Sequence, residues 1–217
     1  MSPAARPVLD PRDLEDVVRR YRDRIAASGV TFASLCSGSA EKQALRHAVH
    51  ATALRGEGPS VLDIGCGIGW FYEHLRKSGM ACRYTGYDIV PEYVDECRRL
   101  FPEATFELRN IFADGIGGSF DTVVMSQVLN NRYRNSDNGE VMRTAMARAF
   151  EHARVSISVD MLSTYVDFQD PDLFYYSPEE VFRYAHTLTR RVALRHDYRA
   201  FEFTVQLFRE DAPGYIR

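Results

Sequence analysis

The stretch SVLDIGCGIGWF, residues 60–71, decides the fold because a short apolar run with one acid precedes three alternating glycines. The apolar run has the length of a buried strand, and the residues after the glycines have helical periodicity. A glycine-rich turn between a strand and a helix lets the backbone come close to a nucleotide. The dinucleotide fingerprint G-x-G-x-x-G is not met from Gly65 or from Gly67. The stretch therefore indicates a small ligand that carries a ribose but is not a dinucleotide.

Strand and helix patterns alternate along the chain around this stretch. Helices are expected over residues 12–27, 41–54, 70–78, 91–101, 140–153 and 177–188. Strands are expected over residues 60–65, 82–89, 105–111, 120–127, 155–162, 191–198 and 201–208. The last two strands are too close in sequence for a crossover helix, so they must pair as an antiparallel hairpin. The pattern predicts an α/β fold with a doubly wound, mostly parallel seven-stranded sheet and an antiparallel terminal hairpin.

The expected domain organisation is a single structural domain with an N-terminal extension. Residues 1–55 are interpreted as a helical cap over the active site, and residues 56–217 as the ligand-binding catalytic domain. The apolar face of the second cap helix is predicted to consist of Ala44, Leu45, Ala48 and Val49. The polar residues on its opposite stripe are Gln43, Arg46 and His50.

The composition argues against several classes of partner. The formal net charge is −3, and no basic stripe indicates nucleic acid or an anionic membrane. No uninterrupted apolar run approaches the length of a membrane span, so a cytoplasmic protein is expected. The four cysteines, Cys36, Cys66, Cys82 and Cys97, show no Cys-x-x-Cys spacing, and we expect reduced thiols and no metal site.

Four ordered motifs resemble those of the class I S-adenosylmethionine-dependent methyltransferases. They are VLDIGCGIGWF (61–71), YTGYDIVPEYV (84–94), FELRNIF (106–112) and FDTVVMSQVLNN (120–131). Asp88 follows Gly69 by 19 residues, close to the separation of about 20 at which an acid reaches a ribose in Rossmann-type sites. The resemblance implies a Rossmann-like fold, S-adenosylmethionine as cofactor and S-adenosylhomocysteine as product.

The resemblance also implies which residues hold the cofactor. Gly65 and Gly67 would approach its methionyl and ribose parts, and Asp63 would position the turn. Asp88 would accept hydrogen bonds from both ribose hydroxyls. The other residues expected at the cofactor are Cys66, Gly69, Ile89, Asn110, Ile111, Ser126 and Gln127.

Several of these assignments depart from the family pattern or leave a choice. Asn110 occupies the place of a family Asp that contacts the adenine amino group, and an amide carbonyl can still accept that bond without charge assistance. Ser126 and Gln127 would offer backbone carbonyls to the methionyl amino group. The cofactor carboxylate needs a donor, for which Arg46 is the first candidate and Gln43 the alternative.

The acceptor is expected above the carboxyl ends of the fourth and fifth strands, under the cap. Asn131, Tyr133 and His196 are the predicted catalytic residues, with His196 as a possible general base. The predicted substrate-binding residues are Tyr21, Asn130, Arg132, Tyr165, Tyr175 and Tyr176. Asp160 could orient the acceptor or bind a metal, although no companion acid–amide pair supports a metal.

The resulting hypothesis is methyl transfer to an O or N atom of a small metabolite. Methyltransferases of this fold that act on amino groups of nucleic-acid bases typically carry Asn/Asp-Pro-Pro-aromatic where this chain has SQVL, residues 126–129. Analogy at the level of the fold suggests a role in bacterial secondary metabolism. Two alternatives remain open: attack on the aminopropyl chain of the same cofactor, and a non-catalytic cofactor-binding module.

Overall fold

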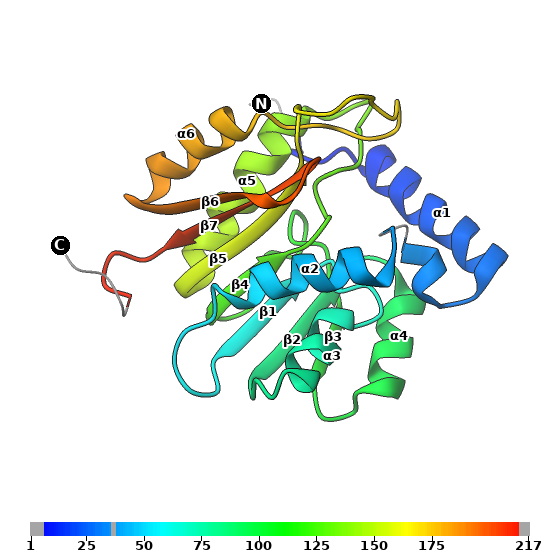
Figure 1. The fold of residues 1–217 in the computed structure, drawn as a ribbon. Coiled ribbons are helices and arrows are strands. Elements are labelled where there is room, and N and C mark those ends of the chain that lie inside the picture. Colours follow the sequence, from blue (N-terminus) through cyan, green and yellow to red (C-terminus); the bar gives the residue numbers. More distant parts are fainter. Residues whose placement is uncertain (1–6, 36–37, 213–217) are drawn as a thin grey trace, which may run out of the picture.

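The centre of the fold is a seven-stranded sheet in the order β3-β2-β1-β4-β5-β7-β6 (Figure 1). The structure is a computed structural model that describes residues 7–35 and 38–212. The strands are β1 (Ser60–Ile64), β2 (Arg83–Asp88), β3 (Thr105–Leu108), β4 (Phe120–Met125), β5 (Ala153–Leu162), β6 (Arg191–Arg199) and β7 (Glu202–Phe208). Strand β7 pairs antiparallel with β5 and β6, whereas β1 to β5 pair in parallel. The predicted sheet and its terminal hairpin are confirmed.

Helices cover both faces of this sheet, as Figure 1 shows. Their bounds are α1 (Pro11–Ser28), the short 3₁₀ helix η1 (Phe32–Leu35), α2 (Ala40–Ala51), α3 (Trp70–Lys77), α4 (Pro91–Leu100), α5 (Asn138–His152) and α6 (Pro178–Leu188). Helices α2, α3 and α4 lie on one face, and α5 and α6 lie on the other. Because each parallel crossover returns the chain to the same edge, the loops after β1, β2 and β4 meet at the carboxyl ends of the strands.

Local sequence explains where most helices begin. Pro91 occupies the first turn of α4, where its missing N–H is not needed. The Ser177 hydroxyl accepts from the Glu180 N–H at the start of α6, as the capping pattern predicts. Helix α5 begins at Asn138, two residues before the predicted start, because the Asp137 side chain caps it by accepting from the Glu140 N–H.

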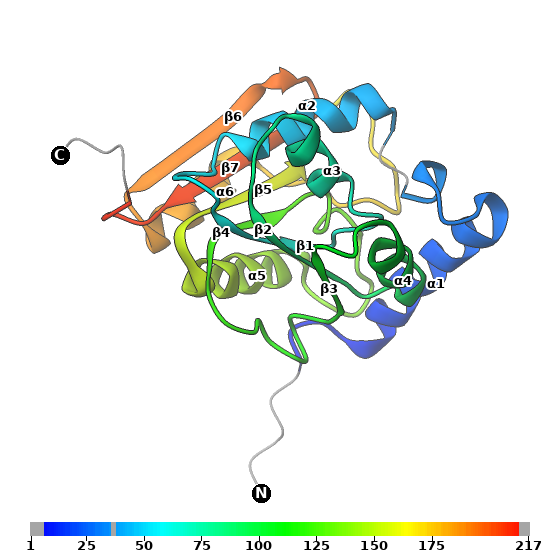
Figure 2. The same cartoon turned by 90° about the horizontal axis from the view of Figure 1, so that it is seen from below.

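Helix α1 lies across the carboxyl end of the sheet, beside α4 (Figures 1 and 2). The side chain of Asp13 is buried and accepts hydrogen bonds from the backbone N–H groups of Arg134 and Asn135 and from the Ser136 hydroxyl. Burial alone would raise the pKa of Asp13, but these hydrogen bonds hold it below the ordinary value. One buried carboxylate therefore attaches α1 to the loop that follows β4.

Helix α2 packs against the sheet and also borders the cavities at its carboxyl end. It packs beside α3 and against β5, and its Gln43, Arg46 and His50 are buried. Leu45, assigned to the apolar face, is 49% exposed. The predicted orientation of this helix was wrong, because its polar stripe meets buried polar groups on β5 and β7. Residues of α1 and η1 line the cavities at the carboxyl ends, and the division into a cap of residues 1–55 and a catalytic domain stays a prediction.

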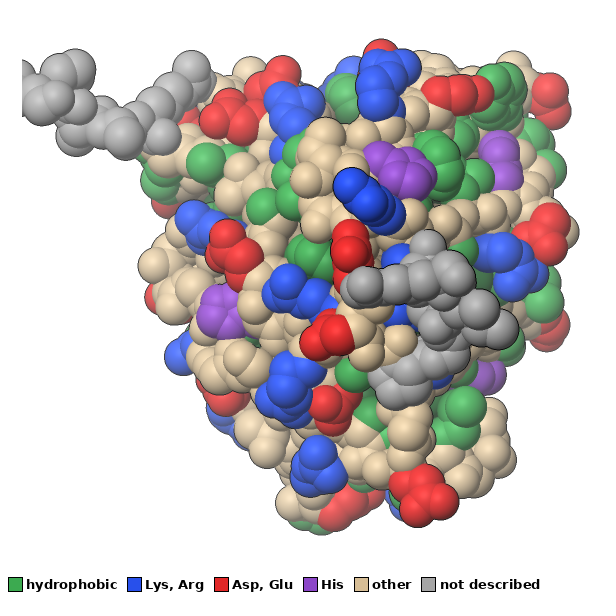
Figure 3. Space-filling model, turned by 90° about the vertical axis from the view of Figure 1, so that its left-hand side faces the viewer, with side chains coloured by type: hydrophobic (Ala, Val, Ile, Leu, Met, Phe, Trp, Pro, Cys, Tyr) green, Lys and Arg blue, Asp and Glu red, His purple; other side chains and the backbone are tan. Residues whose placement is uncertain are grey.

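The side of the molecule that faces away from α1 has a mixed surface. In Figure 3 basic and acidic side chains alternate with apolar ones on this side, outside the grey atoms. At the start of β4, Asp121 forms ion pairs with Arg154 at 2.9 Å and with Arg83 at 3.7 Å. Among the described residues, no helix combines the length and the apolar character that a membrane span requires.

Candidate functional site

The glycine turn after β1 packs closely against neighbouring side chains. Gly65 and Gly67 have φ values of 75° and 54°, which disfavour any other residue. A Cβ on Gly65 would lie 2.5 Å from Cγ2 of Val128, and one on Gly67 would lie 2.7 Å from Cδ2 of Leu35. The turn is thus pressed against side chains from η1 and from the loop after β4, next to the cavity it lines.

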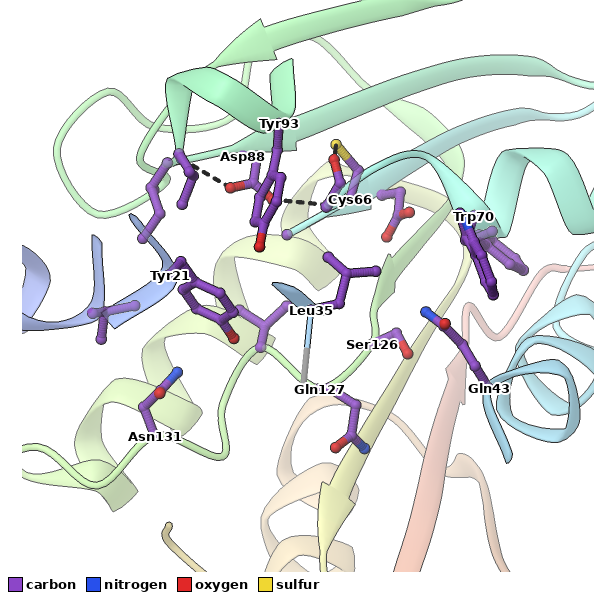
Figure 4. Close-up of a pocket in the computed structure, with 18 of the residues that line it drawn as sticks. Tyr21, Leu35, Gln43, Cys66, Trp70, Asp88, Tyr93, Ser126, Gln127 and Asn131 are labelled. Carbon is purple, nitrogen blue, oxygen red and sulfur yellow. Dashed lines mark hydrogen bonds between the residues drawn. The ribbon is translucent and has the colours of Figure 1, made fainter. Parts of the chain in front are cut away.

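Asp88, at the end of β2, organises this turn. Its carboxylate accepts from the Gly67 N–H at 2.8 Å and from the Val90 N–H at 2.9 Å (Figure 4, dashed lines). Burial is the main influence on its pKa and raises it above the ordinary value. Both carboxylate oxygens are therefore held in place, and each retains capacity to accept a further hydrogen bond.

The central cavity lies between the glycine turn, the loop after β4, α1 and α2, and its volume is about 110 Å³. Figure 4 shows Leu35 among the lining side chains, with Asp88 and Tyr93 on one side and Ser126 and Gln127 on the other. Three buried polar atoms in its lining have no hydrogen-bond partner among the described residues. They are Gln43 Oε1, Asp63 Oδ1 and Gln127 Nε2. Buried polar groups without partners are costly, so their presence here points to a ligand with polar groups.

Two further cavities adjoin the central one, and Asn131 lines all three. The apolar cavity, about 80 Å³, shares Asp88 and Ile89 with the central cavity and has mainly apolar walls. These walls include Leu14, Ile111, Met125, Val128 and Leu129. The second, about 270 Å³, shares Tyr21, Leu35 and Gln127 with the central cavity. We call it the basic cavity after the basic side chains in its lining: Arg20, Arg24, Lys42, Arg46 and Arg199.

Asp160, near the end of β5, holds the loop after β4 in position. Its fully buried carboxylate accepts from the Gln127 N–H at 2.5 Å and from the Ser126 hydroxyl at 3.1 Å. His50 Nε2 lies 3.3 Å away and Arg46 Nε 3.8 Å away, both on α2. Burial alone would raise the pKa of Asp160, but the hydrogen bond and charge of His50 and the charge of Arg46 lower it. Gln127 has a φ of 61°, a strained conformation for a non-glycine residue.

Comparison with known proteins identifies the family. A methyltransferase domain profile matches residues 61–159. A Mycobacterium tuberculosis (strain ATCC 25618 / H37Rv) protein named as methyltransferase Rv1506c is 30% identical over 158 residues, which are 67% of this chain and 90% of that protein. The chain belongs to the class I S-adenosylmethionine-dependent methyltransferases.

Solved structures share the fold of this methyltransferase. The Synechocystis PCC 6803 magnesium protoporphyrin IX methyltransferase with bound S-adenosylhomocysteine has a TM-score of 0.63 at 15% identity, over 92% of this chain and 97% of that one. The DhpI–SAM–HEP complex has a TM-score of 0.67 at 17% identity, over 91% and 98%. A TehB-like enzyme of Corynebacterium glutamicum ATCC 13032 has a TM-score of 0.54 at 18% identity, over 92% and 98%.

The residues of the methyltransferase fit its cofactor, S-adenosylmethionine. The central cavity offers the Asp88 carboxylate, which suits ribose hydroxyls, and unpaired polar atoms on Asp63 and Gln127, which suit an amino or carboxylate group. The apolar cavity offers Ile89 and Ile111, which suit the faces of an adenine ring. Each of these contacts with the cofactor stays a prediction.

Arg46 and Gln43, the two candidates to bind the cofactor carboxylate, line different cavities. Arg46 is buried against Glu202 and Asp160 and lines the basic cavity, whereas Gln43 and His47 line the central cavity. Gln43, the alternative to Arg46, is thus in the better position to donate to a carboxylate. The pKa of His47 lies well below its ordinary value, mainly because the ring is buried. The ring is therefore neutral at pH 7.

Two other predicted cofactor residues at the glycine turn, and Asn110 just after β3, make contacts within the protein. Gly69 is the N-cap of α3, and a Cβ there would lie 2.8 Å from Cε2 of Phe101, so it serves helix packing and does not line the cavity. Cys66 lines the central cavity, but it also packs beside the Cys97 thiol. Asn110 lines the apolar cavity, and its side-chain Oδ1 already accepts a hydrogen bond from the Phe112 N–H at 2.9 Å.

Of the predicted acceptor residues, Tyr21, Asn130 and Asn131 line the basic cavity. Asn130 Nδ2 donates to Gln127 Oε1, so Asn130 also positions the loop after β4. Tyr133 lines the apolar cavity instead, where burial raises the pKa of its hydroxyl. Asn130 and Asn131 reach the basic cavity because they lie in the loop after β4. Tyr21 reaches it because it lies on α1, the helix that Asp13 attaches to the same loop.

The other residues predicted at the acceptor do not line the basic cavity. His196 lies on β6 between the rings of Tyr165 and Phe203, each 6.0 Å away, and lines none of the three cavities. Tyr165 is 59% exposed and donates to Glu179. Tyr176 is buried and donates to the Leu129 carbonyl. The other two, Arg132 over the Phe174 ring and Tyr175, which accepts from the Asp170 N–H, also lie outside the basic cavity.

Sequence reasoning missed several residues of the central cavity: Val17, Leu35, His47, Trp70, Phe71 and Tyr93. Trp70 stacks on Phe32 of η1 at a centroid distance of 4.5 Å, and the Tyr93 hydroxyl donates to the Ser34 carbonyl. The position of Trp70 at the first turn after the glycines was the available signal. Leu35 gave none, since an apolar residue in a short loop has no distinctive pattern.

Replacement of Asp63 with asparagine should change how stability depends on pH. Burial raises the pKa of Asp63 to about 7, so between about pH 4 and pH 7 the folded protein retains a proton that the unfolded chain has lost. Its contribution to folding therefore becomes less favourable as pH rises. We expect Asp63→Asn, relative to the unmodified protein, to gain about 2–3 kcal/mol between pH 5 and pH 8.

The measurement is urea unfolding of both proteins across that pH range. The Tyr84 hydroxyl, which donates to Asp63 Oδ2 at 2.5 Å, can still donate to the asparagine carbonyl. Asp95→Asn, an exposed change on α4, is the control for the loss of one carboxylate. A stability difference that does not change with pH would contradict the assignment.

Proposed function

We propose that this methyltransferase transfers a methyl group to an O or N atom of a small metabolite. The observation that carries the proposal is the basic cavity, which shares Tyr21, Leu35, Gln127 and Asn131 with the central cavity. Its volume of about 270 Å³ suits a small molecule, and α1 and η1 contribute to its lining. Expected roles in secondary metabolism and in the cytoplasm remain predictions.

The residues of the chain would act mainly by positioning. When bound, the cofactor supplies an activated methyl group on a sulfonium, so no covalent nucleophile from the protein is needed. Asn131 and Tyr21 lie where both cavities meet and can orient the acceptor. Leu35, which lines both cavities, would help to exclude water from this meeting point. None of the described histidines lines the basic cavity, so the proton of the acceptor would pass to solvent or to a carboxylate of the lining, Asp170 or Asp172.

The test is mass spectrometry after incubation with S-adenosylmethionine that carries a deuterated methyl group, together with a bacterial metabolite extract. We expect S-adenosylhomocysteine and a labelled small molecule to form together. Methylthioadenosine that keeps the label, formed above its level in a protein-free control and without a labelled acceptor, would instead indicate attack on the aminopropyl chain. Cofactor binding with neither product would favour the non-catalytic binding module. An inactive control is Asp88→Ala, which removes the predicted ribose contact.

A further inference from the structure

The basic cavity has a charge that the methyl transfer itself does not require. Five basic side chains line it: Arg20 and Arg24 from α1, Lys42 and Arg46 from α2, and Arg199 from β6. Three acidic side chains line it as well: Asp170, Asp172 and Glu202. The cations come from three separate elements, which only the tertiary fold brings together.

The deep part of this cavity is already neutralised. Glu202 is 5% exposed and pairs with Arg46 at 3.2 Å and with Arg199 at 2.9 Å. Arg46 also lies beside the buried Asp160. Two arginines and two carboxylates thus compensate each other, and the excess of positive charge does not come from this floor.

The excess comes from the wall that α1 and the start of α2 form. Across residues 7–35 and 38–212, Arg20, Arg24 and Lys42 take part in no ion pair. Arg20 Nη1 donates to Asn131 Oδ1 at 3.0 Å, and the Arg24 guanidinium lies 5.5 Å from the centre of the Tyr21 ring. Both partners are neutral, so they orient these arginines without removing their charge.

The carboxylates of Asp170 and Asp172, on the opposite side of the cavity, form no ion pair with the cations of α1 and α2 among the described residues. Asp170 Oδ1 accepts from the Asp172 N–H within their own loop. Asn131, which Arg20 holds, lines the central cavity too. A group bound by Arg20 would therefore lie next to the site of methyl transfer.

We propose that the basic cavity recognises an anionic group of the acceptor, a carboxylate or a phosphate-type oxyanion, through Arg20 and Arg24, with Lys42 at the exposed edge. Arginine binds such groups through paired N–H donors, and charge-assisted hydrogen bonds of this kind are the strong ones. This inference rests on the proposed function, because it names the chemical class of the acceptor. It predicts that neutral analogues of the acceptor are poor substrates.

The first test measures anion binding without catalysis. Inorganic phosphate and acetate are titrated by calorimetry into the protein saturated with S-adenosylhomocysteine, at constant ionic strength. We expect binding of at least one probe, weakened about ten-fold or more in the double variant Arg20→Gln/Arg24→Gln. Arg19→Gln is the matched control, since Arg19 is exposed on the same helix, pairs with Asp16 and lies outside the cavity.

The probes also distinguish the two anion chemistries. Tighter binding of phosphate indicates a phosphate-type acceptor, and tighter binding of acetate indicates a carboxylate. The inference is overturned if the unmodified protein, the double variant and the control all bind a given probe with the same affinity. It is also overturned if neither probe binds at all. The affinity for S-adenosylhomocysteine and the thermal unfolding of the variants show that any loss is local.

A second test keeps this inference separate from the proposed function. The labelled-methyl assay is repeated on metabolite fractions separated by anion exchange. Label in the anionic fraction, lost in the double variant but not in Arg19→Gln, supports the inference. Label only in the neutral or cationic fractions overturns it and leaves the proposed function standing. Anion binding without any labelled product supports the anion site and overturns the proposed function.

Discussion

Replacement of Asp88 with alanine is expected to weaken binding of S-adenosylmethionine and S-adenosylhomocysteine about 100-fold. A hydrogen bond to a charged acceptor contributes roughly 1.5–3 kcal/mol, and two such bonds to ribose hydroxyls would be lost. A loss of about 3 kcal/mol corresponds to roughly two factors of ten in the dissociation constant. Calorimetric titration of S-adenosylhomocysteine into the purified variant measures this change directly.

The same substitution also frees the Gly67 N–H, so the cause of the loss must be separated. Asp88→Asn keeps an acceptor oxygen for that N–H while it removes the charge, and we expect it to lie between alanine and the native residue. Asp95→Ala, exposed on the neighbouring α4, should bind as the unmodified protein does. An unchanged dissociation constant in Asp88→Ala would refute the ribose assignment.

Replacement of Asp160 with alanine is expected to lower the free energy of unfolding by about 3–5 kcal/mol. Removal of one member of a buried charged cluster leaves the other charges uncompensated, which is more costly than the absence of the whole cluster. Arg46 would keep only Glu202 as a buried counter-charge, and the Gln127 N–H and the Ser126 hydroxyl would lose their acceptor. Without that acceptor, the strained Gln127 should relax toward an ordinary conformation.

Urea unfolding measures the loss of stability. Cofactor titration measures whether the relaxation of Gln127, which lines the central cavity, also weakens cofactor binding. Asp197→Ala is the matched control, because Asp197 is 65% exposed in a surface pair with Arg195, and such pairs contribute about 0–1 kcal/mol. Asp160→Asn tests the outcome in a protein that retains more stability, since its carbonyl can still accept from Gln127. A loss below about 1 kcal/mol in Asp160→Ala would show that the cluster does not stabilise the fold.

The parts of the site that sequence reasoning located follow the strands directly. Asp63, Gly65 and Asp88 stand at the ends of β1 and β2, and parallel pairing brings these ends to one edge. Ser126 and Gln127 follow β4, which pairs with β1, and they join the same cavity. In each case the resemblance to the family motifs named the residue, and parallel pairing of the strands accounts for its position at this edge.

The errors occurred where a side chain depends on distant partners. Helical periodicity correctly grouped Gln43, Arg46 and His50, but it could not show that this stripe faces the sheet. That choice is made by Asp160 and Glu202, which lie more than 100 residues away in sequence. His196 likewise alternates on β6 toward Tyr165 and Phe203, away from the cavities.

The sequence by itself determined the sheet, the glycine turn and the acid at the end of β2. These features depend on local periodicity and on backbone conformations that only certain residues accept. Only the tertiary structure decided that α2 turns its polar stripe inward and that α1 brings Arg20 to Asn131. Buried charges must find their partners wherever the chain folds them together, and sequence spacing does not record that pairing.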